Sequence, residues 1–69
     1  MSLPDIFRAN LKAVMAERGL SKRKVFLAAK MSANHFYWLL DGDGGVTLKT
    51  VQKICEALNV EPSVMLEEQ

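Results

Sequence analysis

The chain has little of what metal sites and disulfides require. Its 69 residues include one cysteine, Cys55, and one histidine, His35. A single cysteine cannot close an internal disulfide, and one cysteine with one histidine disfavours a zinc site. We therefore expect no bound metal and no cofactor. The absence of disulfides is typical of a reducing compartment, which predicts a cytoplasmic protein.

Long apolar segments are also missing. The N-terminal stretch MSLPDIFRANLK has no apolar segment of the kind found in signal peptides. No apolar run approaches the roughly 20 residues that a membrane span needs, so no membrane association is expected. Linkers, repeats and low-complexity segments are absent as well, which predicts a single domain over residues 1–69.

The alternation of apolar and polar residues that marks strands is absent, whereas apolar residues recur at helical spacing. A serine or threonine precedes each of four such segments and is the predicted N-cap: Ser2, Ser21, Ser32 and Thr47. Gly19 and Asn59 suit helix ends. The pattern predicts an all-α, compact five-helix fold, with helices at about 4–18, 22–29, 33–40, from Thr47 to Leu58, and from Pro62 to about Leu66.

The apolar positions also predict which side chains are buried. The fourth helix is expected to bury one stripe, formed by Leu48, Val51, Ile54, Cys55 and Leu58. In the helix at 33–40, Phe36, Leu39 and Leu40 share one face. The opposite face of that helix carries Ala33, Asn34, Tyr37 and Trp38. Cys55 is therefore interpreted as a small apolar core residue and not as a reactive thiol.

The charges are unevenly distributed although the net charge is only +1. Residues 1–30 carry seven Lys and Arg against two acidic residues, a net charge of +5. Residues 31–69 carry two Lys against six acidic residues, a net charge of −4. A basic half favours a polyanionic partner, although charged residues on a solvated helix face are the simpler interpretation.

Two short helices joined by a short turn, at 22–29 and 33–40, form a helix-turn-helix pattern. In such a unit the first helix crosses the DNA backbone and the second enters the major groove. Ser21-Lys22-Arg23-Lys24 suits the first role, because helix-start amides and cationic side chains both bind phosphate.

An ordered set of residues from about Phe7 to Leu66 carries a family resemblance. The set comprises Leu11, Val14, Gly19-Leu20-Ser21, Val25, Ala29, Met31-Ser32, Phe36, Leu39, Gly42, Thr47-Leu48, Val51, Ile54, Leu58-Asn59-Val60, Pro62 and Met65-Leu66. With this spacing, the chain resembles the phage repressor/Cro-type (XRE-like) helix-turn-helix domain. The resemblance implies a repressor-like five-helix domain that binds double-stranded DNA operators, usually as a homodimer.

Position by position, the resemblance assigns base reading to the recognition helix at about 33–40 and its cap: Ser32, Ala33, Asn34, Tyr37 and Trp38. Asn34 is the best candidate, because an amide can bond adenine N6 and N7 together. Phosphate contacts fall on Lys22 and Arg23, with Lys30 and His35 as further candidates. The alternative for Asn34 is a solvated residue at a helix start, and a lone histidine such as His35 is more often a plain surface residue.

The sequence departs from the family pattern at several positions. Lys30 occupies a turn position usually held by glycine, where the chain needs a left-handed conformation. Phe26 replaces a small residue, so either the two helices are splayed or Phe26 points elsewhere. Asp41 and Asp43 replace a basic loop and would repel DNA. Tyr37 and Trp38 replace polar readers.

Two functions follow as hypotheses. The first is a sequence-specific transcriptional regulator, a small dimeric Cro-like repressor of phage or prophage type, with Val64 and Leu66 as dimerisation candidates. The second is a protein-interaction module on the same fold, using exposed Tyr37 and Trp38, which are residue types enriched in binding hot spots. No catalytic constellation is present, so we expect neither an enzyme nor a small-molecule ligand.

Overall fold

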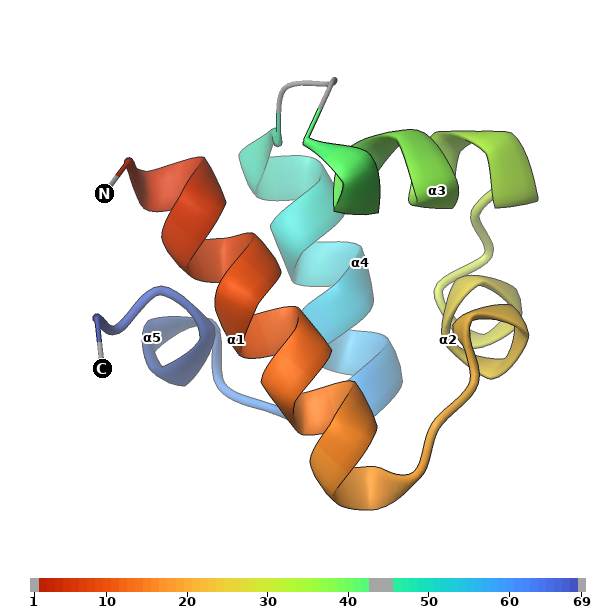
Figure 1. Cartoon of the computed structure of the whole chain (residues 1–69), viewed down its shortest axis with the longest axis horizontal. Coiled ribbons are helices and arrows are strands. Elements are labelled where there is room, and N and C mark those ends of the chain that lie inside the picture. The colour runs from red at the N-terminus through yellow and green to blue at the C-terminus, as the bar shows by residue number, and fades with distance from the viewer. Residues whose placement is uncertain (1, 43–45, 69) are drawn as a thin grey trace.

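The computed structural model describes residues 2–42 and 46–68, and within these ranges the chain is helical, without strands. Five helices follow one another: α1 (Leu3–Arg18), α2 (Lys22–Ala28), α3 (Ala33–Asp41), α4 (Leu48–Leu58) and α5 (Pro62–Met65) (Figure 1). The predicted all-α fold of five short helices is confirmed, with each helix within one or two residues of its predicted limits.

The helices begin where the sequence places a hydroxyl side chain. Each of the four predicted N-caps accepts the backbone N–H three residues later, at 3.1–3.3 Å: Ser2 from Asp5, Ser21 from Lys24, Ser32 from His35 and Thr47 from Thr50. Such bonds satisfy donors that have no partner inside the helix. Gly19 and Asn59 end α1 and α4, as predicted, and both adopt the left-handed conformation that is common at helix ends.

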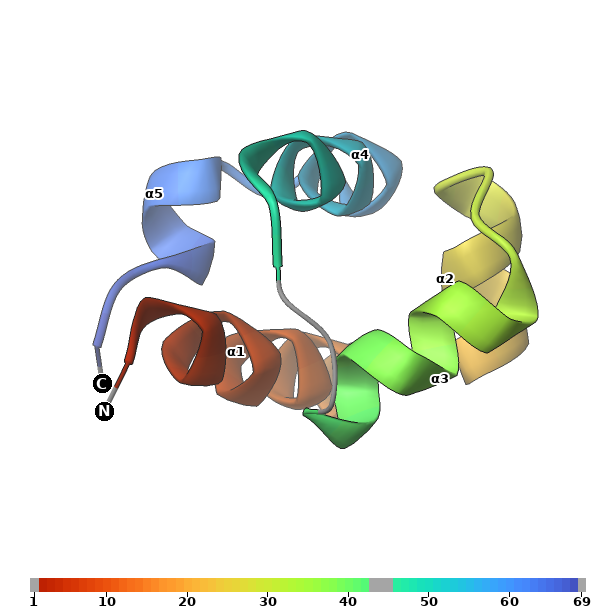
Figure 2. The ribbon, with the colours of Figure 1, turned by 90° about the horizontal axis from the view of Figure 1, so that it is seen from above.

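Two layers enclose the core. Seen from above, α1 and α4 lie opposite each other, α5 lies at one end, and α2 with α3 lies at the other (Figure 2). The side chains between the layers are almost all apolar, and the largest fully buried ones are Phe7, Phe36, Leu11, Leu39, Ile54, Met65, Val25 and Cys55. Phe36, Leu39 and Leu40 point into this core, as their shared helix face predicted.

One predicted core residue lies outside. Leu48 is 77% exposed, so its assignment to the buried stripe of α4 is wrong. It is the first residue of α4 and lines a shallow surface hollow with Leu3 and Leu66, whereas Thr50 and Val51 of the same turn are buried. The rest of the stripe is buried: Val51, Ile54, Cys55 and Leu58. Helical spacing predicts the face of a helix but not how far its neighbours cover it.

Burial raises the pKa of the Cys55 thiol, and the negative charge of Glu61 raises it further. A raised pKa keeps the thiol protonated and weakly nucleophilic, which agrees with a core role.

No helix in the described part of the chain is long and apolar enough to cross a bilayer.

Candidate nucleic-acid interface

The α2–α3 unit rests on a tight turn. Its two helices cross steeply, with α2 viewed almost end-on and α3 lying across the view (Figure 1). Lys30 adopts the left-handed conformation, with φ 57, that the sequence predicted for this position. The N–H groups of Lys30 and Met31 donate to the carbonyls of Leu27 and Phe26, at 3.2 and 2.9 Å. These bonds hold a lysine in a backbone conformation that glycine adopts more easily.

Phe26 packs between the two helices. Its side chain is 9% exposed and lies 6.1 Å, centroid to centroid, from the ring of Phe36. Of the two alternatives raised by the sequence, the one in which Phe26 points elsewhere is therefore wrong. Burial of a phenyl ring between α2 and α3 removes a large apolar area from water, which favours this placement.

The outward face of α3 contains most of the predicted base readers. Asn34 is exposed, Trp38 is 52% exposed and Tyr37 is 42% exposed. Ala33 is only partly exposed and packs against the core. The Ser32 hydroxyl accepts the His35 N–H at 3.1 Å, so this side chain also serves as a helix cap. Four members of the predicted set are therefore exposed, Ser32, Asn34, Tyr37 and Trp38, and Ser32 is at the same time the cap of the helix.

A shallow hollow runs along α3 and is lined by Asn34, His35, Trp38 and Asp41. The rings of His35 and Trp38 lie 6.5 Å apart across it. Asp41 was predicted to lie in a loop, but it is the last residue of α3. There its charge meets the negative end of the helix dipole and faces the same hollow as Asn34. Asp43, the other predicted acidic loop residue, lies outside the described residues.

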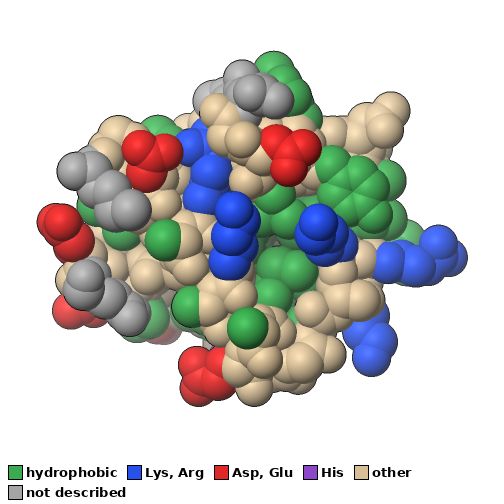
Figure 3. Space-filling model, viewed as in Figure 1, with side chains coloured by type: hydrophobic (Ala, Val, Ile, Leu, Met, Phe, Trp, Pro, Cys, Tyr) green, Lys and Arg blue, Asp and Glu red, His purple; other side chains and the backbone are tan. Residues whose placement is uncertain are grey.

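Basic side chains gather beside this face. Lys22, Arg23 and Lys24 are all exposed in the first turn of α2. Lys12 of α1 and Lys22 line one hollow together with Met15, Leu40 and Asp41. Figure 3 shows blue side chains spread over α1 and α2 on this face, with a green patch over α3 and a red side chain near its end. The surface is therefore cationic around an apolar centre.

Lys22 also reaches across to α3. Its Nζ lies 5.5 Å from the centroid of the Tyr37 ring. The same ring also contacts Phe26, edge to face at 6.1 Å and 87°. The structure therefore brings together a predicted phosphate contact and a predicted base reader, which the sequence treated as separate.

The other phosphate candidates are more scattered. Arg23 is exposed near Lys22, and His35 lies on the flank of α3. Lys30 lines a different hollow, between the end of α2 and α4, with Lys53 and Glu56 among its neighbours. Lys30 thus lies on the side of α2 that faces α4, in a different hollow from the one that Asn34 lines, and its phosphate contact stays a prediction.

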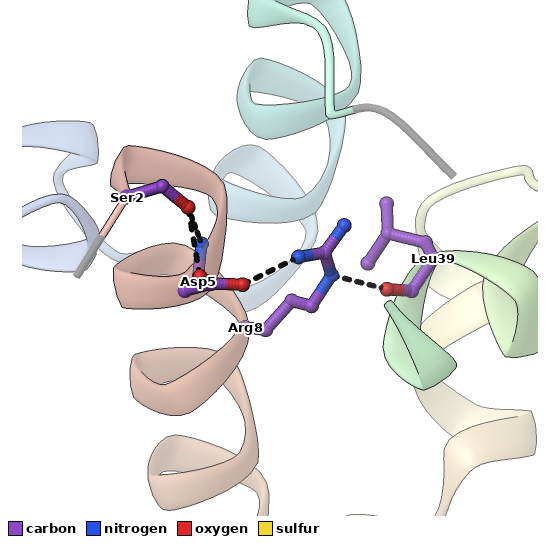
Figure 4. A network of polar contacts seen from close by, with 4 residues as sticks. All are labelled: Ser2, Asp5, Arg8 and Leu39. Carbon is purple, nitrogen blue, oxygen red and sulfur yellow. Dashed lines mark hydrogen bonds and ion pairs between the residues drawn. The ribbon is translucent and has the colours of Figure 1, made fainter. Parts of the chain in front are cut away.

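Arg8, one of the seven cations in residues 1–30, links α1 to α3 (Figure 4). Its Nε donates to the carbonyl of Leu39 at 2.7 Å, and its Nη1 pairs with Asp5 Oδ1 at 3.0 Å. The Ser2 hydroxyl donates to Asp5 at 2.8 Å, and this bond, with the Arg8 charge beside it, lowers the pKa of Asp5. Arg8 thereby supports the end of the recognition helix.

The dimerisation candidates differ in accessibility. Val64 on α5 is 46% exposed, whereas Leu66 is partly buried and packs against the core. Two further apolar residues are exposed near Leu66, and they share a shallow hollow with it: Leu3 and Leu48.

No group of three or more His, Cys, Asp and Glu that could hold a metal occurs among the described residues.

Comparison with known proteins gives one finding. The family model described as Cro/C1-type HTH DNA-binding domain matches residues 10–67, a span that includes most of α1 and all of α2 to α5. This match confirms the resemblance seen in the sequence. The chain has no significant match among curated proteins or among solved structures.

Proposed function

The chain belongs to the Cro/C1-type helix-turn-helix DNA-binding family, which makes it a DNA-binding regulator, and from this premise we propose that it is a small dimeric repressor of Cro-like type. In this proposal α3 lies in the major groove of an operator. The observation that carries it is the exposed Asn34 on the outward face of α3, a helix whose Tyr37 is in contact with the cation Lys22 of α2.

Each side chain has a separate role in the proposal. Asn34 bonds a base edge, adenine being the best match for an amide that donates and accepts together. Lys22 and Arg23 bind phosphates and supply affinity without reading sequence. Trp38 offers a large apolar surface beside Asn34, suited to contact with thymine methyl groups.

The proposed homodimer is supported by the dimensions of the molecule. Half-sites in an operator lie about 34 Å apart, one turn of DNA. The longest dimension of the Cα trace is 26 Å, with α5 at one end and the α2–α3 side at the other (Figure 1). Two copies joined near Val64 can therefore place their recognition helices at a spacing of this order.

Binding to DNA tests the proposal. Operators are selected from a random duplex pool by the protein itself, and affinity for the selected duplex and a scrambled one is measured at two salt concentrations. We expect binding that weakens steeply with salt and prefers the selected duplex. Asn34→Ala should reduce this preference about tenfold, since one bidentate base contact contributes roughly 1–3 kcal/mol. Gln52→Ala, which removes an exposed amide from α4, is the matched control.

A protein-interaction role is the second candidate, and it is favoured by the exposed Tyr37 and Trp38 beside Asp41. Absence of DNA binding even at low salt would refute the proposed repressor function, and the protein-interaction role would remain. In that case Trp38→Ala should change the oligomeric state seen in size-exclusion chromatography. No enzymatic activity or small-molecule ligand is part of either proposal, and a cytoplasmic location and phage or prophage origin stay predictions.

A further inference from the structure

Two departures from the family pattern meet in one cluster. Phe26 stands where a small residue is usual, and Tyr37 stands where a polar reader is usual. The edge-to-face contact between their rings joins them across the α2–α3 unit, with centroids 6.1 Å apart. Phe26 also packs against Phe36, which is fully buried, so the cluster is connected to the hydrophobic core. The large residue on α2 thus supports the large residue on α3.

The third member of the cluster is Lys22. Its ammonium group lies 5.5 Å from the centroid of the Tyr37 ring, within the roughly 6 Å over which an aromatic ring attracts a cation. A lysine side chain has four rotatable bonds and loses much freedom when it binds a phosphate. A ring that restricts the side chain beforehand reduces that loss.

The other charges around Lys22 do not replace this contact. Lys12 and Asp41 line the same hollow, the first repelling the ammonium and the second attracting it. No ion pair of Lys22 occurs within the part of the chain that the structure describes. On α3, Asp41 only shares a hollow with Lys22, whereas the Tyr37 ring lies at a defined distance from its ammonium group.

We propose that Tyr37 is a positioning residue and not a base reader: its ring, supported by Phe26, holds the Lys22 ammonium between α2 and α3, where it takes one DNA phosphate. The inference rests on the proposed DNA binding. It accounts for the replacement of a polar reader by an aromatic ring, since the ring acts through the lysine. It also leaves sequence reading to Asn34 and Trp38.

A double-mutant cycle in DNA binding tests the coupling. Lys22→Gln removes the charge and should lower the slope of log K against log salt by about 0.9. Tyr37→Leu removes the ring and should weaken binding to the selected and the scrambled duplex equally, about two- to fivefold. In the Lys22→Gln background, Tyr37→Leu should have no further effect. Lys49→Gln, which removes an exposed charge from α4, is the matched control.

Tyr37→Phe separates positioning from reading. The phenyl ring keeps its attraction for a cation, so this variant should bind like the wild type. A base contact through the hydroxyl would be lost instead, and the preference for the selected duplex would fall. A change of preference in Tyr37→Phe, or additive effects of Tyr37→Leu and Lys22→Gln, would overturn the inference while leaving DNA binding intact.

A measurement without DNA completes the design. Protons on the carbon next to Lys22 Nζ should show an upfield NMR shift from the ring current in the wild type and in Tyr37→Phe. The shift should disappear in Tyr37→Leu, and a missing shift in the wild type overturns the inference directly. Failure of the wild type to bind any DNA is a different result, because it refutes the proposed function first and the phosphate role with it.

Discussion

Lys30 shows at the residue scale how the turn between α2 and α3 is held. Its backbone is left-handed, with φ 57, as is that of Asn59 at the end of α4, with φ 55. Asparagine tolerates this conformation better than other residues with a side chain, whereas lysine does not share that tolerance. Met31, the next residue, is buried in the core and fixes the turn from its other side. The turn therefore keeps a strained residue because its neighbours determine its conformation.

Replacement of Lys30 by glycine should stabilise the protein. Glycine relieves the left-handed strain, and part of the gain is lost to its greater freedom in the unfolded chain. The expected net gain in the free energy of unfolding is about 0.5–1 kcal/mol, measured by urea denaturation.

The converse change is the control at this scale. Gly19→Ala places a Cβ in open space, but at φ 64, so it should destabilise by about 1 kcal/mol from backbone strain alone. Equal stability of wild type and Lys30→Gly would show that the turn carries no such strain.

At the scale of the helices, α1 holds α3, α4 and α5 in place through side-chain hydrogen bonds. Three of its polar side chains donate to carbonyls at or near the C-terminal ends of three helices: Arg8 to Leu39 of α3, Arg18 to Leu58 of α4 and Asn10 to Met65 of α5. Carbonyls in the last turn of a helix lack partners within it, so these bonds complete each helix end. Two of the cations that make the first half of the chain basic, Arg8 and Arg18, are thus hydrogen-bonded to carbonyls of the chain itself.

Asn10 gives the clearest test of this role. Its Nδ2 donates to the carbonyls of Met65 and Glu67, at 2.7 and 2.9 Å, and the side chain is buried. Asn10→Ala leaves two carbonyls without that donor, which should lower the free energy of unfolding by on the order of 2 kcal/mol. Amide hydrogen exchange should accelerate first in α5.

Two variants control the Asn10 experiment. Asn10→Asp keeps the shape but sets a carboxylate against two carbonyls, so it should destabilise at least as much as Asn10→Ala. Glu17→Ala, an exposed change on the same helix, should stay within about 0.5 kcal/mol of the wild type. Unchanged exchange in α5 of Asn10→Ala would contradict the fastening role.

On the scale of the whole molecule, α2 and α5 lie at opposite ends (Figure 2), so the helix that carries Lys22, Arg23 and Lys24 is separated from the helix that carries the exposed Val64. In the proposed dimer, this separation leaves the α5 end available for a second copy while α3 contacts DNA. Val64 is the exposed member of the predicted dimer pair, whereas Leu66 already contributes to the core of its own chain.

Val64→Asp should therefore give a monomer at concentrations where the wild type is a dimer, because a carboxylate in a small apolar interface is costly to bury. Sedimentation equilibrium over a range of protein concentrations measures this. Leu27→Asp changes a similarly exposed apolar residue on α2 and should remain dimeric. A dimer that persists in Val64→Asp but is lost in Leu27→Asp would contradict an interface at α5 and indicate one at α2.

The amino-acid sequence by itself determined the features that depend on near neighbours. Ser2, Ser21, Ser32 and Thr47 start helices because each bonds an amide three residues away. The buried face of Phe36, Leu39 and Leu40 follows from helical spacing, whereas the left-handed turn at Lys30 was implied by the resemblance to the family, which usually has glycine there. The ordered set of apolar, capping and turn residues was sufficient for the family as well, since its members occupy fixed positions along these helices and their ends.

Only the tertiary structure decided what depends on distant partners. Arg8 and Leu39 are 31 positions apart, and Asn10 and Met65 are 55 apart, so no local pattern links them. Leu48 has core spacing but lies beyond the cover of its neighbours. The contacts of Tyr37 with Phe26 and Lys22 arise because α2 and α3 cross steeply. Periodicity predicts which face of a helix is apolar, while the packing of helices determines what each outward side chain meets.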